Sequence, residues 1–83
     1  IEAGINEGLS PEIANELVIE TALGAARMAK MSIDNPKILK ENVTSPGGTT
    51  EAALSVFYEK GFVETVGKAI RSAKLRSKEL SED

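Results

Sequence analysis

The sequence predicts an all-α fold, a small bundle of four or five helices. Apolar residues recur at helical spacing along most of the chain, and no segment has the alternating pattern of a strand. The hydrophobic share is 41%, yet only Phe57, Tyr58 and Phe62 are aromatic. The apolar content is therefore mainly Ala, Leu, Ile and Val, which suits close packing of helix against helix. The length of 83 residues allows one domain, residues 1–83.

The composition also restricts how so small a domain can be stabilised. A chain of this length buries only about 60–65% of the surface that its unfolded form exposes, so disulfides, metals or partner subunits usually contribute. The sequence has no cysteine and no histidine, which excludes a disulfide, a thiolate or zinc site and a His-based catalytic dyad. A partner subunit is the option that is left, and we expect a homodimer.

The ends of the chain suggest a segment of a longer, cytoplasmic protein. It begins at Ile1 without an initiator Met and without a helix cap, so we expect a fragment cut inside a helix. No apolar run approaches 18 residues and no signal peptide is present, so we expect a soluble chain without a membrane partner. The absence of cysteine fits a reducing cytoplasm.

The net charge is −3, and the acidic and basic residues are unevenly distributed along the chain. Residues 1–26 contain five acidic and no basic residues: Glu2, Glu7, Glu12, Glu16 and Glu20. Residues 68–78 contain five basic and no acidic residues: Lys68, Arg71, Lys74, Arg76 and Lys78. Either these are solvated helix faces, or the two ends face each other within the fold or across a dimer. We expect no nucleic-acid partner, because the pI is about 5.0 and no aromatic residue interrupts the basic stretch.

The first two helices follow from capping signals. Residues 1–7 read as the end of a helix that Gly8 stops. Ser10-Pro11-Glu12 reads as a helix start, with a capping hydroxyl, a proline in the first turn and an acid at the positive end of the dipole. Residues 11–32 then form the dominant helix, with a broad apolar stripe. Apolar residues on a second side, and Gly24 among alanines, favour a helix that another helix approaches closely.

The remaining helices are shorter or more polar. Asp34-Asn35-Pro36 ends the long helix, and Asn35 is a plausible cap for a short helix to about residue 43. The next helix covers about 50–60, and Gly61 stops it. The last covers about 63–80, and residues 81–83 should fray. Short connections predict antiparallel neighbours. We expect these side chains to be buried: Ala53, Leu54, Phe57, Val66, Ala69, Ile70 and Ala73.

One segment has unusual chemistry, the loop from Thr44 to Thr50 at the start of a helix. Its two glycines allow positive φ and a close approach of the backbone to a ligand. Backbone N–H groups of Gly48, Thr49 and Thr50 would point outward at the positive end of the helix dipole, and Ser45, Thr49 and Thr50 add hydroxyls. This predicts a site for a carboxylate or phosphate. A plain helix cap after an ordinary Pro-Gly turn is the alternative. The loop is neither a Walker A motif nor a dinucleotide fingerprint.

Three sets of residues give the chain a family resemblance. Residues 43–50, Val-Thr-Ser-Pro-Gly-Gly-Thr-Thr, followed by Ala53-Leu54, resemble the signature of pyrroline-5-carboxylate reductases. Residues 21–26, Thr-Ala-Leu-Gly-Ala-Ala, resemble that family's long central helix, and Gly61-Phe62 and later residues resemble its C-terminal end. Asn35-Pro36 stands where many members have His-Pro.

The resemblance implies a role for the chain and for its loop. Members reduce 1-pyrroline-5-carboxylate to L-proline with NADPH or NADH, and pair an N-terminal Rossmann domain with a C-terminal helical domain that forms an intertwined dimer. This chain resembles only the helical domain, so we expect the isolated chain to be inactive and to hold neither metal nor dinucleotide. By the same resemblance, Ser45, Gly48, Thr49 and Thr50 hold the substrate carboxylate. The Thr50 hydroxyl would act catalytically by bonding to the ring nitrogen.

The residues leave two other functions open. One is a non-catalytic helical dimerisation module whose loop only caps a helix. The other is the C-terminal domain of a related dehydrogenase of the 6-phosphogluconate or hydroxyacid type. Such enzymes carry a catalytic lysine on a helix, and none of Lys30, Lys37, Lys40 and Lys60 lies in a matching motif. Association of dimers into higher oligomers, and the choice between NADPH and NADH, are not determined by these residues.

Overall fold

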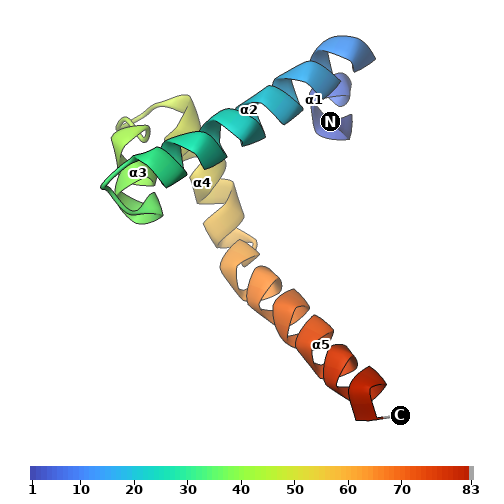
Figure 1. Cartoon of the computed structure of the whole chain (residues 1–83). Coiled ribbons are helices and arrows are strands. Elements are labelled where there is room, and N and C mark those ends of the chain that lie inside the picture. Colours follow the sequence, from blue (N-terminus) through green and yellow to red (C-terminus); the bar gives the residue numbers. More distant parts are fainter. Residues whose placement is uncertain (83) are drawn as a thin grey trace. The chain divides into compact units, whose positions relative to one another are not determined.

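The computed structural model describes residues 1–82, and these residues form five helices and no strand (Figure 1). The helices are α1 (Glu2–Asn6), α2 (Pro11–Met31), α3 (Pro36–Asn42), α4 (Thr49–Glu59) and α5 (Phe62–Glu82). The all-α prediction is confirmed. The chain divides into two compact units, residues 1–41 and the residues from Asn42 onward, and each unit is described by itself. No helix in the described range is long and apolar enough to cross a membrane.

Helix α1 ends at the predicted glycine. Gly8 has φ of 111°, its N–H donates to the Ile5 carbonyl at 3.0 Å, and the Leu9 N–H donates to the Gly4 carbonyl at 3.0 Å. These two bonds form a Schellman motif. The Leu9 side chain lies over α1, because a Cβ placed on Gly4 would be 3.3 Å from Leu9 Cδ1. This contact and the cap hold α1 against the start of α2.

The predicted caps of α2 and α3 are also present. Ser10 Oγ accepts from the Ile13 N–H at 3.3 Å, and Pro11 is the first helical residue. The helix ends at Met31, and Ser32 is extended, with its hydroxyl accepting from the Asp34 N–H at 3.0 Å. Asn35 Oδ1 accepts from the Ile38 N–H at 3.0 Å at the start of α3. These are contacts over two or three residues, which explains why the sequence predicts them.

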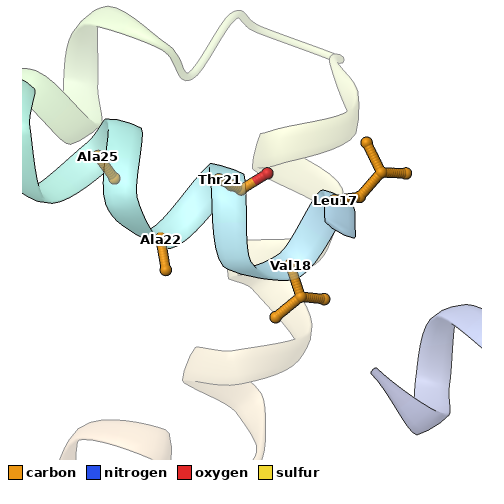
Figure 2. A pocket seen from close by; sticks show the side chains of 5 residues that line it. All are labelled: Leu17, Val18, Thr21, Ala22 and Ala25. Atoms are coloured by element: carbon orange, nitrogen blue, oxygen red, sulfur yellow. The ribbon is translucent and has the colours of Figure 1, made fainter. Parts of the chain in front are cut away.

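Burial differs from the prediction. Among the residues described, only Ala14 is fully buried, and the apolar face of α2 is exposed. Figure 2 shows a shallow hollow on this face lined by five side chains of α2: Leu17, Val18, Thr21, Ala22 and Ala25. A Cβ on Gly24 would have no neighbour within 4 Å, so the expected close approach of a helix is not made inside this chain. The helical pattern of α2 identifies an apolar face but not the surface that covers it.

A glycine joins α4 to α5 in the second unit. Gly61 has φ of 74°, its N–H donates to the Tyr58 carbonyl at 3.2 Å, and its carbonyl accepts from the Thr65 N–H at 2.9 Å. The same residue therefore closes α4 and opens α5. The expectation that these neighbours run antiparallel is wrong, since α5 continues away from α4 (Figure 1). The left-handed conformation of Gly61 and the bond from its N–H to the Tyr58 carbonyl set the direction in which α5 leaves α4.

The long helix α5 is exposed along its described length. Val66 and Ile70 are 40% and 65% exposed, and Ala69 and Ala73 are exposed as well, so the predicted burial of this face is wrong for the single chain. In α4, Leu54 is half-buried while Ala53 and Phe57 are exposed. Helix α5 extends past the predicted end at about residue 80, since residues 81 and 82 are helical and the Ser81 hydroxyl donates to the Lys78 carbonyl at 2.9 Å. Asp83 lies outside the described residues.

Candidate functional site

Residues 45–48 form a type II turn immediately before α4. The Ser45 carbonyl accepts from the Gly48 N–H at 2.9 Å, and Gly47 has φ of 73°. Proline is favoured at the second position of this turn because its φ is already set, and glycine at the third because φ must be positive there. The order Ser-Pro-Gly-Gly therefore determines the shape of the loop.

Helix α4 begins at this turn without a side-chain cap. Its N-cap is Gly48, with φ of −86° and ψ of 179°, and the Ala52 N–H makes the first helical bond, to the Gly48 carbonyl at 3.1 Å. The alternative prediction, a plain cap by a serine or threonine hydroxyl, is therefore wrong. The Glu51 carboxylate instead reaches back, and its Oε1 accepts from the Gly47 N–H at 3.1 Å.

This contact of Glu51 is not among those predicted from the sequence. Its signal is an acid at the third position of a helix, which is where the capping-box motif places a Glu that bonds backwards to the backbone. In the capping box that Glu bonds to the N–H of the N-cap itself. In this chain it bonds one residue earlier, because the N–H of Gly48 is already used by the turn.

These bonds change the set of donors that the loop can offer. The Gly48 N–H points into the turn, so the prediction that it faces outward unpaired is wrong. The N–H groups of Thr49, Thr50 and Glu51 occupy the first three helical positions, where no carbonyl lies four residues back inside the helix. They lie at the positive end of the α4 dipole, which favours an anion. Of the three N–H groups predicted to be unpaired, those of Thr49 and Thr50 thus have no partner inside α4.

The four predicted site residues belong to the turn and to the first turn of α4. Gly48 and Thr50 are half-buried, while Ser45 and Thr49 are exposed. Within the described chain, the hydroxyls of Ser45, Thr49 and Thr50 make no hydrogen bond. The loop therefore has two backbone N–H groups without a partner inside α4 and three hydroxyls without a hydrogen bond, which are donor types that small anions such as carboxylates accept from.

The described residues do not form a metal site or a dinucleotide site. The described residues contain no group of three or more acidic side chains placed to hold a metal ion. They also form no strand, so the strand, glycine turn and helix that hold a dinucleotide pyrophosphate are not built by residues 1–82. The nicotinamide cofactor implied by the family resemblance does not fit a site made by these residues alone.

Comparison with known families decides between the interpretations. Residues 1–80 match the family described as pyrroline-5-carboxylate reductase dimerisation. The chain belongs to this family. The match covers almost every residue, and neither a generic helical module nor a dehydrogenase of the 6-phosphogluconate or hydroxyacid type is favoured beside it.

Individual members of the family are similar over nearly the whole chain. A pyrroline-5-carboxylate reductase of Pseudomonas aeruginosa is 49% identical over 98% of this chain, and the chain covers 30% of its length. Pyrroline-5-carboxylate reductase 1 of Bacillus subtilis is 40% identical over 99% of the chain, which covers 28% of its length. The chain thus spans less than a third of these relatives.

A solved structure has the same fold. The crystal structure of the Plasmodium falciparum pyrroline carboxylate reductase with NADP bound matches 87% of this chain, with a TM-score of 0.85 and 38% identity. The chain covers 28% of that protein. The fold predicted from the sequence is therefore one that a member of the family adopts.

Proposed function

We propose that this chain is the C-terminal dimerisation and substrate-binding domain of a reductase that converts 1-pyrroline-5-carboxylate to L-proline with NADPH or NADH. Family membership over residues 1–80 carries this proposal. The similar Plasmodium protein binds NADP, which supports a nicotinamide dinucleotide for the whole enzyme. An N-terminal Rossmann domain outside this chain would hold it, because residues 1–82 form no strand.

The loop before α4 would bind the substrate carboxylate. Backbone N–H groups of Thr49 and Thr50 at the positive end of α4 supply two donors, and the Ser45 and Thr49 hydroxyls supply two more. Gly48 contributes its small size and not its N–H, since a Cβ there would lie 3.1 Å from the Ser45 carbonyl oxygen. Glycine at this position therefore leaves the turn undisturbed.

Thr50 would act on the ring nitrogen. The dinucleotide supplies a hydride to the C=N carbon, and the nitrogen then gains electron density and a proton. The Thr50 side chain is half-buried and its hydroxyl makes no hydrogen bond within the described chain. It can hold the nitrogen in position or hold a water molecule beside it. A threonine hydroxyl is a weak acid, so hydrogen bonding or water-mediated protonation is favoured over direct transfer.

A second copy of the chain would cover the exposed apolar faces. Leu17 and Val18 are 51% and 44% exposed on α2, and Ile70 is 65% exposed on α5. Faces of this kind mark an interaction surface, and a family named for dimerisation identifies the occupant as another copy. Association of dimers and a cytoplasmic location stay predictions from the sequence.

Replacement of Thr50 tests the assignment in the full-length enzyme. Thr50→Val keeps the shape of the side chain and removes the hydroxyl, so kcat should fall about 10²-fold, as for loss of one preorganised donor. Thr50→Ser keeps a hydroxyl and should retain most activity, and both variants should unfold within a few degrees of the parent. An unchanged kcat/KM for both Thr50→Val and Ser45→Ala would refute the loop assignment.

The isolated domain supplies an independent test. With NADPH and 1-pyrroline-5-carboxylate it should show no turnover above background, because the dinucleotide site is expected elsewhere. It should nevertheless bind L-proline, followed by amide shifts of residues 45–51. Turnover by the isolated domain would contradict the two-domain proposal. Absence of L-proline binding by a folded dimer would favour a purely structural role.

A further inference from the structure

We infer that Glu51 is a positioning residue for the carboxylate-binding loop, one that fixes the loop but also raises the KM for an anionic substrate. The inference rests on the proposed function and deepens it. The contact that carries it is the hydrogen bond from the Gly47 N–H to Glu51 Oε1 at 3.1 Å. Nothing in the family resemblance or in the family's description assigns a role to this side chain.

The position of Gly47 explains why one bond to it matters. Gly47 is the third residue of the turn, with φ of 73°, and a glycine there has many other conformations to choose from. The turn itself supplies one bond, from the Gly48 N–H to the Ser45 carbonyl. The Glu51 carboxylate adds a second from inside the helix, so the peptide on each side of Gly47 is tied down.

Fixing Gly47 also fixes the N–H groups that would bind the substrate carboxylate. With both glycine N–H groups engaged, the turn enters α4 in one conformation, and the N–H groups of Thr49 and Thr50 are held in the first turn. Loss of the Glu51 bond would free Gly47 and let the turn sample other conformations. Part of the free energy of substrate binding would then be used to order the loop, so KM would rise.

The charge of Glu51 acts in the opposite direction. Its carboxylate belongs to the first turn of α4, the same turn whose N–H groups would receive the substrate carboxylate. Two negative groups at one helix end repel each other and share the same dipole. A neutral side chain that keeps the carbonyl oxygen in place should therefore bind the substrate more tightly than the native glutamate does.

Because the hydrogen bond and the charge of Glu51 have opposite effects on KM, two variants are needed to separate them. Glu51→Gln retains an oxygen that accepts from the Gly47 N–H and removes the charge, so KM for 1-pyrroline-5-carboxylate should fall about 2- to 5-fold at low salt. Glu51→Ala removes both, so its KM should exceed that of Glu51→Gln by about 3- to 10-fold, the effect of losing a hydrogen bond of ordinary strength. In both variants kcat should change less than 2-fold, because Glu51 acts through the loop and not on the reacting atoms.

Glu64 provides a matched control in the same protein. It occupies the third position of α5, as Glu51 does in α4, since α5 begins at Phe62 directly after Gly61. Glu64→Ala removes an equal charge from an equivalent helix start outside the loop. It should leave KM unchanged and lower thermal stability less than Glu51→Ala does, because the Glu51 carboxylate accepts a hydrogen bond and the Glu64 side chain makes none among the described residues. A general effect of helix stability would instead change KM in both variants in proportion to the stability that each loses.

The experiment measures kcat and KM of the full-length enzyme for the parent, Glu51→Gln, Glu51→Ala and Glu64→Ala, together with the amide resonance of Gly47 in the isolated domain. The inference expects that resonance to shift in Glu51→Ala and to stay near its native position in Glu51→Gln. If KM in Glu51→Gln and Glu51→Ala equals that of the active parent, the inference fails. If the parent itself shows no turnover, the proposed function fails instead, and the Gly47 resonance still tests the contact.

Discussion

The rings of Phe57 and Phe62 lie 4.8 Å apart with an angle of 47° between their planes, and they join the last turn of α4 to the first turn of α5. The pair occupies the two positions at which a glycine-ended helix commonly makes a hydrophobic contact, one on each side of Gly61. Neither ring is buried, since they are 47% and 50% exposed. The contact therefore fixes a corner of the second unit without forming a core.

Removal of either ring should loosen this corner. Phe62→Ala should lower the free energy of unfolding by about 1–2 kcal/mol, which combines partial loss of apolar burial with an aromatic contact of about 0.5–1.5 kcal/mol. Urea denaturation at fixed protein concentration measures it. Val63→Ala, which removes an exposed neighbour, is the control and should cost less than Phe62→Ala. A double-mutant cycle with Phe57→Ala should give a coupling energy of about 0.5–1.5 kcal/mol, and additivity would mean that the rings do not interact in solution.

Substitution of either glycine of the loop by alanine should destabilise the turn, and the physical reason differs between the two positions. Gly47→Ala places a Cβ in open space but in a left-handed conformation with φ of 73°, which costs about 1–2 kcal/mol of backbone strain. Gly48→Ala has an ordinary φ, yet its Cβ would lie 3.1 Å from the Ser45 carbonyl oxygen and would press on the turn. Gly47→Asn tolerates positive φ and should recover part of the loss. The measurements are thermal stability and KM, and equal stability of Gly47→Ala and the parent would contradict the turn type.

The caps could be predicted from the sequence because each depends on a few adjacent residues. Ser10, Asn35, Gly8 and Gly61 all do what their residue type and spacing indicate. The error at Gly48 was also local, because Ser-Pro-Gly-Gly is a type II turn signal that uses the last N–H. The bond between Gly47 and Glu51 required recognition of an acid at the third helical position, counted from a start one residue earlier than expected.

Burial could not be predicted in the same way. Amphipathic patterns identify which face of α2 and α5 is apolar, but not which chain covers it. The pattern predicts that Val66 and Ile70 face inward, and they are 40% and 65% exposed. An amphipathic pattern indicates that a helix face packs against another surface, and that surface can belong to another molecule.

Gly24 should reveal whether a helix of a second copy approaches α2 closely. In this chain a Cβ on Gly24 meets nothing within 4 Å, and alanine raises helix propensity by about 1 kcal/mol. Gly67 in α5 is equally open and serves as the control. We expect Gly67→Ala to stabilise the domain and Gly24→Ala to weaken the dimer in sedimentation equilibrium. Equal stabilisation by both substitutions would mean that no helix packs closely on Gly24.

The acidic side of α2 and the basic side of α5 should attract each other between two copies. Glu12, Glu16 and Glu20 follow one another at one residue per turn over about 12 Å of α2. Arg71, Lys74 and Lys78 lie within an arc of about 60° over about 10.5 Å of α5, so the two sets have similar lengths. Reversal of charge in either set alone, to three lysines on α2 or three glutamates on α5, should weaken the homodimer at low salt.

A mixture of the two charge-reversed proteins separates contacts between copies from contacts within one. If α2 of one copy faces α5 of the other, each variant repels itself, whereas a heterodimer restores attraction at both junctions and should form preferentially. If the attraction is within one chain, mixing restores nothing, because each variant keeps its own mismatch. Native mass spectrometry of differently labelled variants measures the heterodimer fraction. Loss of the preference in high salt should follow from screening, and a statistical mixture at low salt would contradict the pairing between copies.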